Sequence, residues 1–147
     1  MPNFAASVVI DRPQREVFDY LTDPSHIPEW MEEMQSAEWS SEGQPDVGST
    51  MTARMGSRNP GRELQLEVTK WDPPTGYGDR MLTPVFPVKG MRHEYRFAPD
   101  GNRTRVTLNG EFTMVGGLRF AGGLMQRVAA KFNQRHLDAA KRVLEAG

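Results

Sequence analysis

The feature that most constrains this fold is the order of its predicted elements. A strand at residues 4–11 precedes two short helical segments at 13–21 and 23–31, and a long run of strand-like segments then leads to one amphipathic helix at 118–145. A sheet that curls around a single terminal helix cannot fill its whole interior from that helix. We therefore expect space between the sheet and the helix, and this directs the functional question toward small molecules.

Length and composition are typical of one soluble globular domain. The 147 residues, 37% hydrophobic and 25% charged, predict a single domain, 1–147, with a core of its own. No apolar run reaches the roughly 18 residues of a membrane span, and no secretory signal is visible. Because the chain has no cysteine, disulfides, thiol nucleophiles and thiolate metal sites are excluded. We expect a cytoplasmic bacterial protein.

The charge balance gives no sign of a nucleic-acid-binding protein. With 18 basic and 19 acidic residues, the formal net charge is −1, so no basic excess is available for phosphates. The three histidines are scattered, which does not form the pattern of a metal site. We predict no cofactor and no metal, and the sequence does not distinguish a monomer from a homodimer.

Strand candidates follow one another at fairly regular spacing and are separated by turn clusters. The strongest hairpin signal is the turn cluster Pro99–Asn102 between two alternating runs. Together with the first strand, the candidates predict an antiparallel meander. They lie at 34–41, 47–55, 62–71, 77–83, 91–98 and 104–114.

Alternation along these strands predicts one solvated face and one covered face. The covered face is expected to carry Met51, Ala53, Met55, Leu64, Leu66, Val68, His93, Tyr95, Phe97, Val106, Leu108, Gly110, Phe112 and Met114. On the terminal helix, at about 100° per residue, the predicted apolar stripe is Ala121, Leu124, Met125, Val128, Phe132, Ala139 and Val143. Trp71 is expected to mark a strand end on the outer face.

Several short motifs carry a family resemblance. They are Ile10-Asp11-Arg12-Pro13 leading into residues 17–24, Pro28-Glu29-Trp30, Tyr95-Arg96-Phe97 and residues 100–108. With them, the chain resembles the polyketide cyclase/dehydrase-like branch of the START/Bet v 1 superfamily over essentially its whole length. The resemblance implies the α+β helix-grip fold, in which a seven-stranded curved antiparallel sheet wraps around a long C-terminal helix.

The resemblance also implies a deep and mainly apolar cavity between the sheet and the last helix. Relatives bind lipids, plant hormones, polyketides or other hydrophobic ligands there, and the loops at 56–61 and 83–90 are expected to border its mouth. Family members range from cyclases and hydrolases to carriers and receptors, so the fold alone does not settle the function.

Inward-facing apolar and polar side chains are the candidate ligand contacts. Methionine is abundant, and its flexible thioether suits a surface that adapts to apolar ligands, although methionines also simply fill gaps in a core. The candidate contacts are Trp30, Met51, Met55, Leu64, Leu66, Met81, Phe86, His93, Tyr95, Leu108, Phe112, Met125, Phe132 and His136.

His93, Tyr95 and His136 are the candidates for catalysis, because imidazole and phenol groups can transfer protons or bind a ligand carbonyl. Hydrogen-bonded structural histidines are the favoured alternative. No inward acidic residue stands out as a partner for them, which weakens the case for catalysis.

The favoured function is therefore binding of a hydrophobic small molecule, such as a lipid, polyketide or aromatic compound. The first alternative is a polyketide cyclase, aromatase or dehydratase that uses the His and Tyr residues. The second alternative is a regulatory protein-interaction module, in which the apolar loop Val85–Val88, with Phe86, contacts a protein partner.

Overall fold

The computed structural model describes the backbone of residues 3–147 and their side chains except those of 118–120. The chain forms β1 (Asn3–Ile10), α1 (Gln14–Leu21), the 3-10 helix η1 (Pro24–His26), α2 (Ile27–Trp30), β2 (Met34–Trp39), β3 (Thr50–Met55), β4 (Arg62–Asp72), β5 (Gly76–Met81), β6 (Val88–Asp100), β7 (Arg103–Met114), the 3-10 helix η2 (Gly116–Ala121) and α3 (Gly122–Ala146). The predicted order of elements is confirmed.

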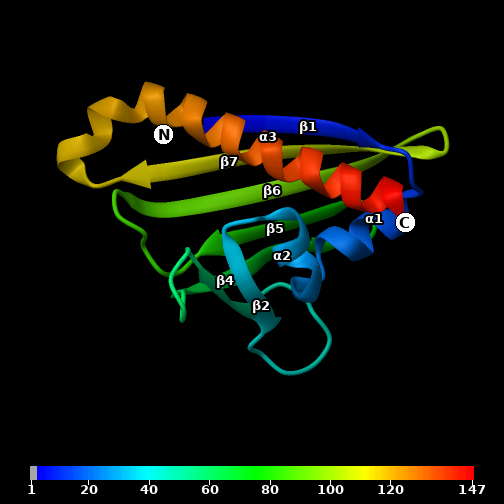
Figure 1. The fold of residues 1–147 in the computed structure, drawn as a ribbon, viewed down its shortest axis with the longest axis horizontal. Helices are drawn as coiled ribbons and strands as arrows, with labels where there is room; N and C mark the ends of the chain where they lie inside the picture. The colour runs from blue at the N-terminus through cyan, green and yellow to red at the C-terminus, as the bar shows by residue number, and fades with distance from the viewer. Residues whose placement is uncertain (1–2) are drawn as a thin grey trace.

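The seven strands form one antiparallel sheet in the order β1-β7-β6-β5-β4-β3-β2. Figure 1 shows α3 running alongside β1 and β7, while α1 lies against β6 and β7, and α2 against β2 and α3. This is the predicted α+β helix-grip fold. No helix of residues 3–147 is long and apolar enough to cross a bilayer.

Local sequence signals explain the two short N-terminal helical segments. Asp23 caps η1, because its carboxylate accepts hydrogen bonds from the Ser25 backbone N–H and hydroxyl at 2.9 and 2.8 Å. Pro24 occupies the first helical position, where a missing N–H costs nothing. In α1, the ring of Phe18 packs edge-on against Phe97, with centroids 5.2 Å apart, so this helix closes one end of the core.

The terminal helix is fixed to the free edge of the sheet. The side-chain amide of Gln134 accepts a hydrogen bond from the Ser7 N–H at 3.2 Å and donates one to its carbonyl at 2.8 Å. Lys141 Nζ donates to the carbonyl of Val9 at 2.8 Å. These bonds occupy backbone groups of edge strand β1 that would otherwise be open to another strand.

The predicted apolar stripe of α3 is wrong. The buried side chains of the helix are instead Asn133, His136, Leu137, Ala140 and Leu144. Of the predicted stripe, Leu124 is 65% exposed, Val128 50%, and Phe132 and Val143 37% each, whereas Ala121, Met125 and Ala139 are half-buried. The helix has two apolar sides: the side that contains Leu137, Ala140 and Leu144 is buried, and the side that contains Leu124 and Val128 is exposed.

The prediction for Trp71 is also wrong. The register between β4 and β5 shifts between Val68 and Lys70, so that Trp71 pairs with Tyr77 and shares its face. The Trp71 ring packs edge-on against Phe18 at 5.5 Å and lies 6.0 Å from the Tyr77 ring, both centroid distances. Trp71 is therefore part of the inner aromatic cluster.

Candidate functional site

A row of apolar side chains crosses the inner face of the sheet toward the end where α3 begins. Leu66 pairs with Met81, and Met91 pairs with Phe112. Met81 follows Arg80 and Met91 precedes Arg92, and these two arginines are the last pair between β5 and β6. Leu66, Met81, Met91 and Phe112 therefore form one row, here called the methionine row. Phe112 is buried, but the other three are only half-buried. The apolar inner face is thus incompletely covered at this end.

The next row on the same face contains a hydrogen-bonded carboxylate and imidazole. Asp79 of β5 pairs with His93 of β6, which pairs with Gly110 of β7. Gly110 has no side chain, and the ring of Phe4 fills the space above it. The Phe4 ring meets the His93 ring edge-on, with centroids 5.9 Å apart. Aromatic packing therefore holds the imidazole in place beside the carboxylate.

Asp79 accepts hydrogen bonds from two side chains at once. Its Oδ1 lies 3.1 Å from His93 Nδ1, and its Oδ2 accepts a hydrogen bond from the Tyr77 hydroxyl at 2.9 Å. Burial raises the pKa of the Tyr77 phenol well above its ordinary value, and the charge of Asp79 raises this pKa further. Tyr77 thus remains a hydrogen-bond donor, and Asp79 keeps the His93 ring in one orientation.

Tyr95 lies in the centre of this face. It is 5% exposed, and its ring centroid is 6.0 Å from that of Tyr77 and 6.4 Å from that of His93. Burial raises the pKa of the Tyr95 phenol, and the negative charges of Asp79 and Glu33 raise it further. Two carboxylates therefore act electrostatically on one protonated phenol.

The second carboxylate is paired with the histidine of α3. His136 Nε2 lies 2.8 Å from one carboxylate oxygen of Glu33 and 3.0 Å from the other. Burial raises the pKa of the Glu33 carboxyl, but the hydrogen bond and charge of His136 outweigh burial, and the net pKa is lowered. Glu33 is therefore ionised at neutral pH and ties the α2–β2 connection to α3.

Two polar atoms beside this pair are buried without a hydrogen-bond partner in the described part of the chain. They are Trp30 Nε1 and His136 Nδ1. The two rings lie edge-on with centroids 6.3 Å apart, and Phe132 packs against His136 at 4.5 Å. Burying an unpaired polar group costs free energy. A polar ligand group that hydrogen-bonded to these atoms would therefore be bound favourably.

The structure places the sequence-predicted contacts at different depths. Trp30, Met51, Leu64, Tyr95, Leu108, Phe112 and His136 are buried, whereas Met55, Leu66, Met81, His93 and Met125 are half-buried. Phe86 is 74% exposed and Phe132 37%. Phe86 therefore points outward from the 82–87 connection, and it does not fold back into the core.

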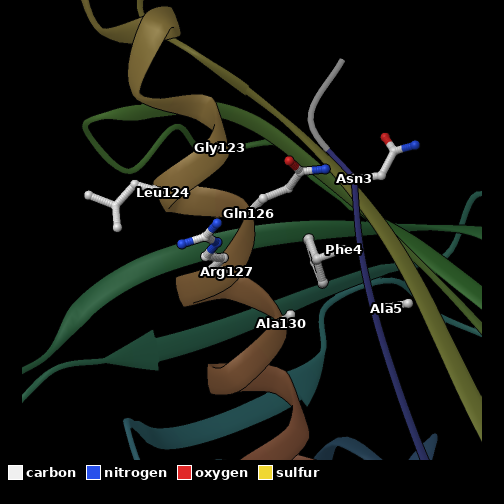
Figure 2. Close-up of a pocket in the computed structure, with 8 residues that line it drawn as sticks. All are labelled: Asn3, Phe4, Ala5, Gly123, Leu124, Gln126, Arg127 and Ala130. Carbon is white, nitrogen blue, oxygen red and sulfur yellow. The ribbon is translucent and has the colours of Figure 1, made fainter.

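A hollow of about 630 Å³ lies between the first residues of β1 and the first turns of α3. Figure 2 shows Gln126 extending toward Asn3 on one side of the helix, while Leu124 points away on the other. Phe4 lines this hollow and also contacts His93. The ring of Phe4 thus borders both the hollow and the Asp79–His93 pair.

Comparison with known proteins identifies the family. Residues 1–145 match the polyketide cyclase / dehydrase and lipid transport family. The chain belongs to this family. No curated protein is significantly similar to it.

Three solved structures that superpose on this chain share its fold. The di-domain ARO/CYC protein BexL, from the BE-7585A biosynthetic pathway, superposes with a TM-score of 0.83 at 15% identity over 99% of this chain and 47% of its own. A START superfamily protein from Mycobacterium smegmatis gives 0.82 at 9% identity, covering 98% and 97%. A protein from Thermus thermophilus gives 0.75 at 19% identity, covering 99% of both chains. The chain thus spans about half the length of BexL and nearly all of the other two.

Sequence reasoning missed two residues of this member of the polyketide cyclase / dehydrase and lipid transport family. The expectation that no inward acidic residue accompanies the histidines is wrong, because Asp79 pairs with His93 and Glu33 with His136. Asp79 could have been found, since it alternates in phase with Tyr77 and Met81 on one predicted strand. Glu33 carries no such signal, because it precedes a strand.

Proposed function

We propose that this protein binds a hydrophobic small molecule against the inner face of its sheet. The observation that carries the proposal is the partial exposure of Leu66, Met81 and Met91, which lie on the inner face of the sheet. Apolar side chains left partly open on an inner face are the surface that a ligand would remove from water. Their flexible thioethers would adapt to its shape.

Polar groups beside the methionine row would orient the ligand. His93 is adjacent to this row, and the protonated phenol of Tyr95 lies one row further inside. A ligand carbonyl or hydroxyl would find a donor or an acceptor there. Burial of about 200 Å² of apolar ligand surface contributes about 5 kcal/mol before ordering costs are subtracted. Because about 5 kcal/mol corresponds to a Kd of about 0.2 mM, tighter binding would need a larger apolar contact or additional polar contacts.

Fluorescence titration with an apolar probe tests this proposal. Met91→Gln keeps the length of the side chain but puts an amide into the methionine row, and we expect it to weaken probe binding about tenfold. Arg92→Gln changes the exposed neighbour on the opposite face and serves as the matched control. Equal affinities for the two variants, or no saturable binding by the wild type, would refute the proposal.

A second candidate function is acid–base catalysis on a polyketide-like or aromatic substrate, and the Asp79–His93 pair favours it. When His93 Nδ1 donates to Asp79, Nε2 carries the free electron pair. Nε2 would take a proton from the carbon next to a substrate carbonyl and return it to a hydroxyl that leaves as water. The fold similarity to a di-domain ARO/CYC protein supports testing such substrates.

Comparison of two histidine variants tests catalysis separately from binding. His93→Gln should abolish turnover of any compound that the protein converts, while leaving its affinity within about threefold. His26→Gln is the control, because His26 pairs with Glu29 on the surface. Retained turnover in His93→Gln would eliminate the catalytic candidate but leave the binding proposal standing.

A further inference from the structure

One side of the first half of α3 combines exposed apolar residues with cations. Leu124 is 65% exposed and Val128 50%, and they stand one turn apart on the side of the helix that points away from the sheet. The exposed cations beside them are Arg127, Lys131 and Arg135. These five residues are called the α3 patch.

The α3 patch carries only positive charge. Between residues 122 and 137 the helix has no Asp or Glu, although the whole chain has a net charge of −1. The guanidinium of Arg135 lies over the Phe132 ring at 5.6 Å, as expected for a cation on an apolar surface. A second copy of this chain would bring like charges together on the patch, so self-association is disfavoured.

A second exposed apolar segment lies at the same end of the molecule. In the 82–87 connection, Phe86 is 74% exposed and Leu82 43%. The N–H of Val115, just before η2 and α3, donates to the Pro87 carbonyl at 3.1 Å. Figure 1 shows the β5–β6 connection and the start of α3 at the same end of the sheet. The cation Lys89 is the second residue of β6, just after this connection.

We infer that the α3 patch and Phe86 dock this protein on an anionic membrane surface. Isolated apolar side chains that project from a helix and are flanked by Lys and Arg match the interface of a bilayer, where the apolar groups enter the acyl boundary and the cations meet phosphates. Docking at two segments of one end would turn the open end of the methionine row toward the lipid. The inference goes beyond ligand binding and does not depend on it.

Co-sedimentation of the full chain with phosphatidylcholine vesicles, with and without phosphatidylglycerol, tests the docking. Wild type should bind only the anionic vesicles, and binding should weaken as salt is added. One cation near an anionic leaflet contributes about fivefold in affinity. Arg127→Glu/Lys131→Glu should therefore weaken binding at least about 20-fold. Leu124→Ser/Val128→Ser should weaken it about tenfold or more.

Matched controls use exposed residues outside the patch. Arg142→Glu reverses a cation at the other end of α3, and Val47→Ser removes an apolar side chain that is 62% exposed. Both should bind vesicles like the wild type. All of these sites are exposed, and thermal melts would verify that each variant folds. The inference is overturned if the wild type binds neutral vesicles as tightly as anionic ones, or if it binds neither. It is also overturned if wild type is a dimer that Leu124→Ser/Val128→Ser splits into monomers.

Discussion

Asp79 and His93 lie opposite each other on neighbouring strands, and Oδ1 of the aspartate is 3.1 Å from Nδ1 of the histidine. The same carboxylate accepts the Tyr77 hydroxyl, and all three groups face the apolar interior. A charged group survives there because hydrogen bonds compensate its lost hydration. The Asp79–His93 pair therefore bears on the stability of the fold and on the orientation of the His93 imidazole.

Removal of the Asp79 carboxylate should destabilise the protein. In Asp79→Ala, the buried Tyr77 hydroxyl loses its acceptor, which should lower the free energy of unfolding by about 1–3 kcal/mol. Tyr77→Phe removes the hydroxyl as well, and the double variant should therefore lose less than the sum of the single losses. Urea denaturation measures all three. Additive losses would show that the two side chains do not interact.

The Glu33–His136 pair should make stability depend on pH. Because the folded-state pKa of Glu33 is lowered, its contribution is fully present above the unfolded value of about 4.3 and is lost as pH falls through the folded value. Glu33→Gln should thus destabilise the protein by about 1–3 kcal/mol at neutral pH and by little in acid. Melting curves at several pH values test this. A difference that stays constant down to pH about 3 would contradict the lowered pKa.

Two glycines should respond to alanine in opposite directions. A Cβ at Gly110 would overlap the Phe4 ring, so Gly110→Ala should cost about 1–3 kcal/mol of unfolding free energy. A Cβ at Gly123 of α3 would meet no atom within 4 Å, and Gly123→Ala should stabilise the helix by about 0.5–1 kcal/mol. Chemical denaturation of both variants checks the contrast. A neutral Gly110→Ala would mean that Phe4 does not occupy that space.

Alanine substitution of two phenylalanines that differ in burial should give very different losses of stability. Phe18 is 1% exposed between Phe97 and Trp71, so Phe18→Ala should cost about 3–5 kcal/mol. Phe86 is 74% exposed, and Phe86→Ala should change stability by less than about 0.5 kcal/mol. Thermal melts measure both. A large loss for Phe86→Ala would place its ring in the core.

The sequence predicted the sheet well because alternation on antiparallel strands is a local signal. The inner positions His93, Tyr95 and Phe97 all face the interior, as expected. Trp71 was predicted on the wrong face because one bulge after Val68 shifts the phase of alternation. No local sequence pattern predicts such a bulge.

The terminal helix shows why long-range packing limits prediction. Apolar residues such as Leu124 and Val128 suggested the buried side, but the side that is buried instead contains Leu137, Ala140 and Leu144. Which of two apolar sides is buried depends on packing against elements far away in the sequence, such as β1. The Glu33–His136 contact was missed for the same reason, since its partners are far apart in sequence.

Native mass spectrometry of the freshly purified protein, alone and after incubation with a fatty acid or an aromatic compound, tests ligand binding most directly. We expect the wild type and Arg92→Gln to carry a non-covalent hydrophobic compound, and Met91→Gln to carry clearly less of it. A wild-type chain that remains bare under every one of these conditions would contradict a ligand site on the inner face of the sheet.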